Sequence, residues 1–361
     1  MKIFYILSGY ISHRQAGLEY IRRLQSLGHK VTCNYPRLLA GEEDNRTLTE
    51  ERCYGFAFDP ARARNAQNAD LIILHEDPAW HDKLFEILPW LAQKRIVAYL
   101  PWENEKLPEA FIRPLRRAQS IWTPSEFCRQ AFLSAFGDVQ VLPHVVRRPK
   151  PGAEALAWAR DLLGMQGAAD CPVFFSAVDG INPRKNLEGL LTAFSLFRKT
   201  SRVKACLLLK QYRTTVPLDG QPDVISISED LGEARMAALY ATCTAYVSAH
   251  RAEGWGLGLS TAMSFGKIAI ATAYSGNMEF MDSSNSLLIP YSMEQVSMQM
   301  EHKIPLFTTE MRWAAPDLGA MAEAMRLVAE GRADQSIGHK AAEITRRFGP
   351  EAINERLAQI L

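Results

Sequence analysis

Short apolar segments alternate with amphipathic stretches of helical periodicity along most of the chain. The segments Ile3–Leu7 and Leu71–Leu74 are continuously apolar, and helical periodicity follows over Ala16–Leu27 and Ala79–Gln93. Continuously apolar strands separated by helices are typical of a parallel sheet covered on both faces. The first half is therefore predicted to be a doubly wound α/β domain. Its other expected strands are Lys30–Cys33, Arg95–Leu100, Ser120–Thr123 and Val139–Leu142.

A linker is predicted at residues 146–152, where Pro149, Pro151 and Gly152 interrupt the pattern. The alternation of strands and helices then begins again. The expected strands are Val173–Ala177, Val203–Leu209, Val224–Ile227, Ala245–Ser248 and Ile268–Ala271, and the expected helices are Leu187–Lys199, Glu233–Ala241 and Leu259–Phe265.

The sequence thus predicts two Rossmann-like domains that face each other across a cleft. The expected bounds are 1–148 for the first domain and 149–348 for the second, with a C-terminal helix, 349–361, that packs back on the first. Tyr291–Ala315 is polar, rich in methionine and aperiodic, so a long loop or insertion is expected there. Ligands of doubly wound sheets bind beyond the carboxyl ends of the strands.

Length and net charge limit the number of domains and the kinds of partner that the chain can have. A length of 361 residues suits two domains of ordinary size. A net charge of +1 excludes a chain-wide basic surface, so no nucleic-acid partner is expected.

Targeting and cysteine patterns favour a cytoplasmic protein. The apolar N-terminus is shorter than a signal peptide requires, and the longest apolar runs have the length of strands. The sequence remains compatible with a peripheral contact with the inner face of the membrane. The six cysteines show no spacing typical of disulfide or metal frameworks and are expected to be reduced thiols: Cys33, Cys53, Cys128, Cys171, Cys206 and Cys243.

The most informative segment is His250–Gly266, which predicts a strand, a glycine-rich turn and a helix. Gly254 and Gly256 allow the backbone to approach a ligand, and the helix offers unpaired N–H groups to a phosphate. Glu253 lies at the mouth of this turn, where a carboxylate can accept hydrogen bonds from sugar hydroxyls. A tight structural turn with a solvated glutamate is the alternative.

A second segment carries basic residues at the start of a predicted helix. Arg184, Lys185 and Asn186 follow the strand Val173–Ala177, so a diphosphate clamp is one interpretation and an exposed basic helix cap is the other. Lys210, at the end of the next strand, is a further phosphate candidate.

The first half contributes weaker candidates at the expected cleft. Gly17 follows the first strand and allows a helix to approach a ligand. Trp102 is expected to stack on a sugar face and Glu103 to orient or deprotonate a hydroxyl, with aromatic packing as the alternative. His75, at a strand end, is a further candidate.

These motifs together resemble the retaining GT-B glycosyltransferases of family four, also called glycosyltransferase group 1. The pattern H-R-x-E-G-W-G-L at 250–257 is similar to that of its bacterial polysaccharide and lipopolysaccharide branch of mannosyl- and rhamnosyltransferases. The R-K-N at 184–186, S-G-N at 275–277, W-A-A-P-D at 313–317 and W-E at 102–103 resemble the same branch.

The resemblance implies transfer of a sugar from a nucleoside-diphosphate donor to a hydroxyl of a glycan or lipid-linked glycan, with retained anomeric configuration. It implies catalytic roles for Glu253, Lys185 and Glu103 and an acceptor side formed by Gly17, Trp102 and His75. The donor-binding residues that it implies are Arg184, Asn186, Lys210, Gly254, Trp255, Gly256, Leu257, Thr261, Ser275, Gly276, Asn277 and Glu279.

No metal and no other cofactor is expected. The sequence has no D-x-D motif and no cluster of His, Cys and Asp with the spacing of metal ligands. Charge on the leaving diphosphate would then be neutralised by Lys185, Arg184 and helix dipoles.

One position departs from the family pattern. Where the family has a second glutamate that holds the ribose hydroxyls, this chain has Thr261, and a hydroxyl cannot bind two ribose hydroxyls as an anion does. The loss of a charge-assisted bond costs about 1.5–3 kcal/mol. A non-catalytic GT-B module that binds a nucleotide or glycan is therefore an alternative. An epimerase or hydrolase of the same architecture is another.

Overall fold

The computed structural model describes residues 1–35, 63, 66–212, 215–218 and 220–361. The chain divides into two compact units, each of which is described by itself. The first unit comprises Met1–Val145 with Phe348–Leu361, and the second comprises Val146–Arg347.

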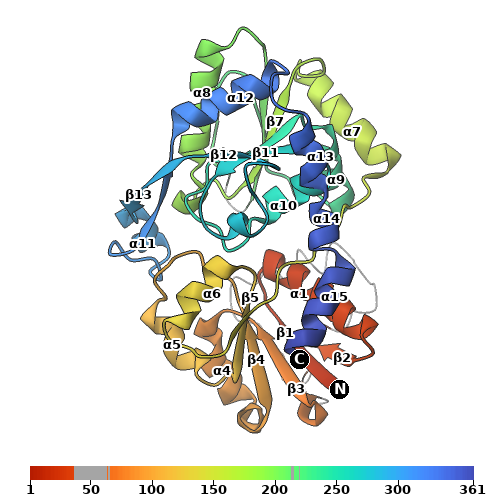
Figure 1. Ribbon diagram of the computed structural model, residues 1–361, viewed down its shortest axis with the longest axis vertical. Coiled ribbons are helices and arrows are strands. Elements are labelled where there is room, and N and C mark those ends of the chain that lie inside the picture. The colour runs from red at the N-terminus through yellow and green to blue at the C-terminus, as the bar shows by residue number, and fades with distance from the viewer. Residues whose placement is uncertain (36–62, 64–65, 213–214, 219) are drawn as a thin grey trace. The chain divides into compact units, whose positions relative to one another are not determined.

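The first unit is built on a six-stranded parallel sheet in the order β2-β1-β3-β4-β5-β6 (Figure 1). Its strands are β1 (Lys2–Leu7), β2 (Lys30–Cys33), β3 (Leu71–His75), β4 (Arg95–Tyr99), β5 (Ser120–Thr123) and β6 (Val139–Val141). Its helices are α1 (Ile11–Ser26), η2 (Pro78–Trp80), α4 (His81–Ile87), η3 (Pro89–Gln93), α5 (Glu109–Leu115), α6 (Glu126–Leu133) and α15 (Pro350–Ile360).

Alternate residues of these strands face two separate hydrophobic cores. On β1, Tyr5 points toward α1 and α15, whereas Phe4 points toward α4 and η3. The C-terminal helix α15 packs against α1 and contributes Ile353 and Leu357 to the first of these cores (Figure 1). Both faces of the sheet are therefore buried, which explains why the strands are continuously apolar.

One predicted helix of this unit is wrong in its extent. The periodicity over Ala79–Gln93 predicts a single helix, but the structure has the short helix α4 followed by the 3-10 helix η3. Pro89 supplies the reason, because proline disfavours the α conformation in the residue before it and cannot donate a backbone hydrogen bond.

The second unit repeats the architecture with the strand order β12-β11-β10-β7-β8-β9. Its strands are β7 (Val173–Val178), β8 (Cys206–Gln211), β9 (Val224–Ile227), β10 (Ala245–Ser248), β11 (Ile268–Thr272) and β12 (Leu287–Ile289). Its helices are α7 (Gly152–Met165), η4 (Pro183–Lys185), α8 (Leu187–Thr200), α9 (Glu233–Thr242), α10 (Leu257–Ser264), η5 (Gly276–Glu279), α11 (Met298–Lys303), α12 (Leu318–Ala329), α13 (Ser336–Ala342) and α14 (Ile344–Arg347).

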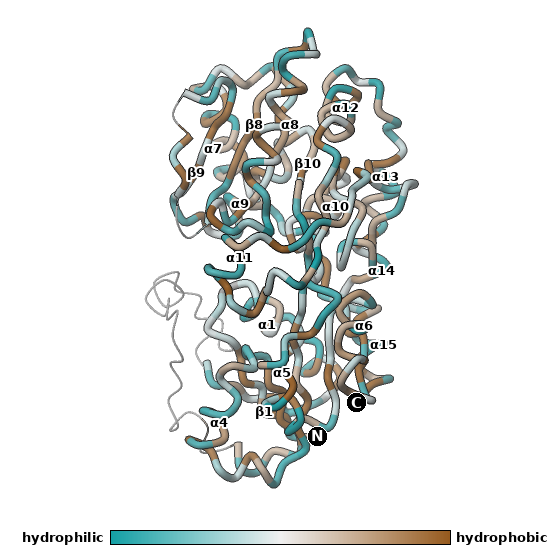
Figure 2. The backbone as a smooth tube through the Cα atoms, turned by 90° about the vertical axis from the view of Figure 1, so that its left-hand side faces the viewer, coloured by the Kyte–Doolittle hydropathy of each residue, from teal (hydrophilic) through white to brown (hydrophobic). Residues whose placement is uncertain are grey.

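Helices cover both faces of this second sheet. Helices α8 and α12 pack together over one face and share a core with β7, β8 and β11, while α7 and α9 pack against each other on the opposite side (Figure 1). Hydrophobic stretches lie along strands such as β8, and hydrophilic stretches fill the connecting loops (Figure 2). The expectation of doubly wound α/β architecture in both halves is confirmed.

Residues 291–315, expected to be a long loop or insertion, lie in a segment with regular secondary structure. They fold into an antiparallel hairpin of β13 (Tyr291–Gln295) and β14 (Arg312–Pro316), with α11 between the two strands. Both strands are only five residues long and β13 is largely polar, so their pattern did not predict them.

Membrane-spanning helices and disulfides are both absent from the described part of the chain. No helix in it combines the length and apolarity needed to cross a membrane. Five cysteines have free thiols, and the sixth, Cys53, lies outside the described residues.

Candidate functional site

The candidate site of the second unit lies at the point where the strand order of its sheet reverses. From β7 the chain proceeds outward to β8 and β9, and then returns to place β10 on the other side of β7. The loops that follow β7 and β10 therefore lie next to each other at the carboxyl edge, the usual position of ligands in such sheets. The first of these loops carries η4, and the second carries Glu253.

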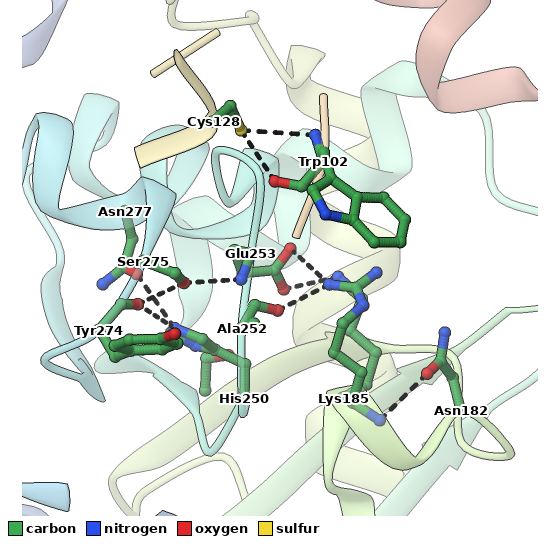
Figure 3. Close-up of polar contacts among 12 residues, drawn as sticks. Trp102, Cys128, Asn182, Lys185, His250, Ala252, Glu253, Tyr274, Ser275 and Asn277 are labelled. Carbon is green, nitrogen blue, oxygen red and sulfur yellow. Dashed lines mark hydrogen bonds and ion pairs between the residues drawn. The ribbon is translucent and has the colours of Figure 1, made fainter. Parts of the chain in front are cut away.

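Glu253 receives the two basic side chains of η4, which are 68 and 69 residues away in the sequence (Figure 3). The Nζ of Lys185 lies 2.6 Å from Oε1 of Glu253, and one terminal nitrogen of Arg184 lies 3.3 Å from Oε2. Arg184 also donates a 2.7 Å hydrogen bond to the carbonyl of Ala252. The glycine-rich turn and the basic helix start, two separate candidates in the sequence, thus form one cluster.

The electrostatics of the cluster keep Glu253 ionised. Burial alone would raise the pKa of this carboxyl, which is only 9% exposed, but the charges of Lys185 and Arg184 outweigh burial and lower its pKa to about 2. Burial lowers the pKa of the neighbouring His250. The cluster therefore holds two cations and one anion at neutral pH, with Lys185 28% exposed and Arg184 buried.

The turn that holds Glu253 is fixed by the facing turn at Ser275. The backbone N–H of Glu253 donates to Oγ of Ser275 at 2.7 Å, and its carbonyl accepts from the N–H of Gly276 at 2.8 Å. A Cβ at residue 276 would overlap the carbonyl of Gly254, so glycine is required there. Ser275 itself has a φ of 77°, a conformation that costs energy and often accompanies functional sites.

Several residues expected to bind the donor make buried contacts that support the two turns. Asn277 is fully buried between His250 and the carbonyl of Thr272, and Asn186 caps α8 and donates to the carbonyl of Ala249. The indole of Trp255 is buried, donates to Ser260 and lies against Phe280.

The remaining expected donor residues surround this cluster. Gly256, with a φ of 98°, precedes the first residue of α10, the partly exposed Leu257. Thr261 lies one turn further along α10, and the carbonyl of the half-buried Glu279 accepts from Arg347. Lys210 is 1% exposed, and its Nζ donates to the carbonyl of Gln211 at 2.6 Å.

The first unit has the same kind of reversal, between β1 and β3. Here Glu76, which the sequence analysis did not single out, accepts hydrogen bonds from Oγ of Ser8 at 2.8 Å and from the N–H groups of Gly9 and Asp77. Burial raises the pKa of Glu76. Its position directly after a buried strand, in the sequence His-Glu-Asp, was the available signal.

His75 and Gly17 belong to a buried layer between α1 and the sheet. Nδ1 of His75, which is 1% exposed, lies 2.9 Å from the hydroxyl of Tyr5. A Cβ at Gly17 would clash with Leu7 and lie 3.1 Å from Nδ1 of His75. Gly17 therefore lets α1 approach the sheet closely, and it lies in the second turn of α1 rather than at its first residue.

Trp102 and Glu103 lie in the loop after β4. The indole of Trp102 is 3% exposed, contacts Phe111 edge-on and donates to the carbonyl of Lys106. Cys128 holds the backbone of Trp102 from the other side (Figure 3). This arrangement favours the packing alternative for Trp102, while Glu103 next to it is partly exposed.

Among the described residues, no group of three or more His, Cys, Asp or Glu side chains has an arrangement that could hold a metal ion.

Comparison with known proteins finds a family match within the second unit. Residues 167–302 match the family model of the glycosyl transferases group 1. The matched segment includes η4 and the turn of Glu253, and thus both halves of the charged cluster. The resemblance to this family is supported over that part of the chain. No curated protein sequence matches the chain.

Solved structures resemble the whole chain in fold. HepE of Anabaena in complex with UDP-glucose aligns with a TM-score of 0.66 and 16% identity over 99% of this chain and 98% of its own. Sucrose-phosphate synthase from Thermosynechococcus elongatus aligns with 0.65 and 16% identity over 100% and 98%. A UDP-forming trehalose-phosphate synthase from Burkholderia xenovorans aligns with 0.63 and 13% identity over 100% and 98%. The predicted two-domain GT-B fold is confirmed.

Proposed function

We propose that this chain is a glycosyltransferase that moves a sugar from a nucleoside-diphosphate donor to a hydroxyl of a glycan-type acceptor, with retention of the anomeric configuration. The observation that carries the proposal is the convergence of Lys185 and Arg184 on Glu253 at the reversal point of the second sheet, inside the segment that matches the family model.

The three charged side chains of the cluster are proposed to have different roles in the reaction. Cleavage of the bond between sugar and diphosphate leaves an oxocarbenium-like sugar and a growing negative charge on the leaving group. Lys185 is the more exposed cation and is the group proposed to stabilise that charge. Arg184 is buried against the carbonyl of Ala252, so its proposed role is to hold the turn of Glu253 in place.

The pair of Lys185 and Glu253 also couples recognition of the two parts of the donor. In the unliganded protein each satisfies the other at 2.6 Å. A diphosphate that draws Lys185 away frees the Glu253 carboxylate, which then accepts hydrogen bonds from the hydroxyls of the sugar. A donor that carries both groups compensates both partners, whereas a free nucleoside diphosphate takes Lys185 from Glu253 and leaves that carboxylate with Arg184 alone.

The finer features of the proposal follow the family resemblance. They are a hexose or deoxyhexose donor, a polysaccharide or lipopolysaccharide acceptor, and catalysis without a metal. The names of several solved neighbours mention UDP or UDP-glucose, which makes UDP-sugars the first donors to assay. Glu103, in the loop after β4, remains the proposed group that orients the acceptor hydroxyl.

A transfer assay tests the proposal. Purified protein is incubated with nucleoside-diphosphate sugars and glycan acceptors in the presence of EDTA, and products are identified by mass spectrometry and by NMR of the anomeric proton. The expected result is an acceptor-dependent glycoside with the configuration of the donor. Release of free sugar without an acceptor would instead identify a hydrolase, and a changed sugar nucleotide would identify an epimerase.

Thr261 favours a second candidate, a non-catalytic module that binds a nucleotide or glycan. The residue lies on α10, the helix that begins at the glycine-rich turn. At this position the family is expected to have a glutamate whose carboxylate binds the ribose hydroxyls of the nucleotide. Thr261→Glu separates the two candidates if the wild type shows nucleotide binding but little turnover. A gain of turnover in the variant would show that the site has lost activity, and no gain would show that it has been remodelled.

A further inference from the structure

The hairpin of β13 and β14 stands apart from the parallel sheet of the second unit, and the proposed chemistry uses none of its side chains. Glu294 on β13 pairs directly across from Trp313 on β14. The indole N–H of Trp313 donates a 3.0 Å hydrogen bond to the carboxylate of Glu294. The two side chains therefore form a fixed unit on one face of the hairpin.

Arg251 extends from the loop of Glu253 onto this unit. One terminal nitrogen of its guanidinium contacts the carboxylate of Glu294, and the guanidinium carbon lies 5.2 Å from the centre of the Trp313 ring. A carboxylate on one side and an aromatic face on the other fix the orientation of a planar guanidinium.

The backbone of Arg251 links the hairpin to the charged cluster. Its N–H donates a 2.8 Å hydrogen bond to the carbonyl of Arg184 in η4, and its carbonyl accepts a 3.0 Å bond from the N–H of Ala314 in β14. The helix α11, between the two hairpin strands, also lies against η4. Residue 251 is thus the junction of three segments, one with Lys185, one with Glu253 and one with Trp313.

We propose that the hairpin braces the donor site, with Arg251, Glu294 and Trp313 as positioning residues that set the distance between Lys185 and Glu253. The catalytic consequence rests on the proposed function, but the mechanical claim does not. Glu253 lies two residues after Arg251, so a shift of that junction moves the carboxylate relative to Lys185, whose own segment is bonded to the same residue.

The chemistry of the contact argues against a purely stabilising role. A half-buried ion pair loses much of its attraction to desolvation, and apolar residues commonly hold two segments together as well or better. The ion pair and the ring instead fix the orientation of the Arg251 side chain, because a planar guanidinium binds a carboxylate in only a few geometries. A contact that fixes the orientation of a residue two positions before Glu253 is typical of residues that hold a functional side chain in place.

The test compares the wild type with four variants by two measurements. The variants Glu294→Gln, Trp313→Phe and Arg251→Lys each remove one element of the contact: the charge, the indole N–H, and the planar fork. Arg312→Ala is the control for a change within the hairpin itself: it removes an exposed guanidinium that donates a 3.0 Å hydrogen bond to the carbonyl of Met293, and it leaves Arg251, Glu294 and Trp313 in place. Hydrogen exchange by mass spectrometry follows the amides of residues 250–256, and kinetics gives kcat and KM for donor and acceptor.

We expect exchange in residues 250–256 of the unliganded protein to accelerate about tenfold in the three variants and to stay unchanged in Arg312→Ala. We expect kcat to fall about tenfold to a hundredfold with an unchanged KM for the acceptor. The acid limb of the rate profile should also move to higher pH, since a displaced Lys185 lowers the pKa of Glu253 less.

Unchanged exchange in the three variants overturns the brace, whatever the activity. Faster exchange with unchanged kcat and donor KM overturns the positioning role. Should the wild type transfer no sugar at all, the proposed function fails, and the exchange experiment still decides whether the hairpin holds the loop.

Discussion

The two parallel sheets of the molecule each reverse their strand order once, but the described strands differ in arrangement, with β2 alone beyond β1 in the first unit and β8 and β9 beyond β7 in the second. The side chains at the two reversal points also differ. In the second unit, the loops after β7 and β10 bring together Lys185, Arg184 and Glu253. In the first unit, the corresponding edge is backed by a layer of uncharged aromatic and histidine side chains that hydrogen-bond to one another.

This uncharged layer centres on the hydroxyl of Tyr20, which lies 2.7 Å from the hydroxyl of Tyr99 and 3.0 Å from Nδ1 of His144. Burial lowers the pKa of His75, and burial lowers the pKa of His144 to about 3, so both rings are neutral at physiological pH. The comparison teaches that topology fixes where a ligand binds, while the residues at the strand ends fix which ligand. Under the proposed function, the charged edge suits a diphosphate. The edge of the first unit, which we call the neutral edge after this uncharged layer, also carries the buried carboxyl of Glu76 and suits a polar acceptor.

The largest effect is expected from Lys185→Ala, which removes the exposed cation of the charged edge. Transfer should fall about a hundredfold to a thousandfold, the range typical for the loss of one group that stabilises transition-state charge. Affinity for the nucleoside diphosphate should fall with it. Lys199→Ala, which removes an exposed lysine from the last turn of α8, is the matched control and should leave both unchanged. Equal transfer by the two variants would remove Lys185 from the clamp.

Glu253→Gln should separate binding of the leaving group from transfer. The substitution removes the anion that competes with a diphosphate for Lys185, so we expect affinity for the free nucleoside diphosphate to rise, by about tenfold, while transfer is lost. Isothermal titration with the diphosphate and the transfer assay measure the two effects. A weaker affinity would show that Glu253 does not compete for the lysine.

The same carboxylate gives the second unit an acid-sensitive contribution to stability. Because its pKa is about 2 when folded and 4.5 when free, the unfolded chain binds the proton first, and the stabilisation is complete above pH 4.5 and lost as pH falls toward 2. The stabilisation that the Glu253 carboxylate contributes above pH 4.5 is on the order of 3 kcal/mol. The free energies of unfolding of wild type and Glu253→Gln should therefore converge over this window, and a constant difference would contradict the low pKa.

The neutral edge should respond to acid at a higher pH. His144 has a pKa of about 3 when folded and 6.5 when free, so the unfolded chain takes up a proton that the folded chain excludes. Stability is complete above pH 6.5 and falls as pH decreases toward 3. Hydrogen exchange should show this loss in the first unit, with a shallower pH dependence in His144→Asn. The same slope in both proteins would mean that His144 is not the responding group.

The smallest effect is expected from Tyr20→Phe. The change removes a buried hydroxyl and leaves the hydroxyl of Tyr99 and the ring of His144 with fewer partners, at a cost of about 1–3 kcal/mol. Affinity for a nucleoside diphosphate should stay the same, as titration can show. A large loss of affinity would mean that the neutral edge also supports the donor.

Much of the fold was predictable because burial on both sheet faces leaves a clear signal. Strands such as Ile3–Leu7 and Ile268–Ala271 are apolar throughout, and the linker is marked by Pro149 and Pro151. The hairpin was not predictable, since Glu294 and Trp313 are paired by a contact between residues 19 apart in a short polar segment. The strand β8 extends into Lys210 and Gln211, whose polar side chains find partners that the sequence does not reveal.

For the site, the sequence motifs predicted the charged residues but not which of them contact each other. Glu253, Lys185 and Arg184 were each candidates, and their mutual contacts come from the neighbouring positions of β7 and β10. Asn277, Asn186 and Trp255 lie in the same motifs but hold the turns by buried contacts. A motif marks a segment, and the fold adds which of its side chains form the charged cluster and which hold the turns around it.

The central claim is that the charged edge of the second unit binds the diphosphate of a sugar nucleotide. The most direct test is a thermal-shift titration of wild type, Lys185→Ala and Lys199→Ala against GDP, UDP, dTDP and ADP in the presence of EDTA. A ligand at 100 times its dissociation constant adds about 2.7 kcal/mol of stability. We predict that one nucleotide stabilises wild type and Lys199→Ala and that Lys185→Ala loses this shift. No shift with any nucleotide, or an equal shift in all three proteins, would contradict the account.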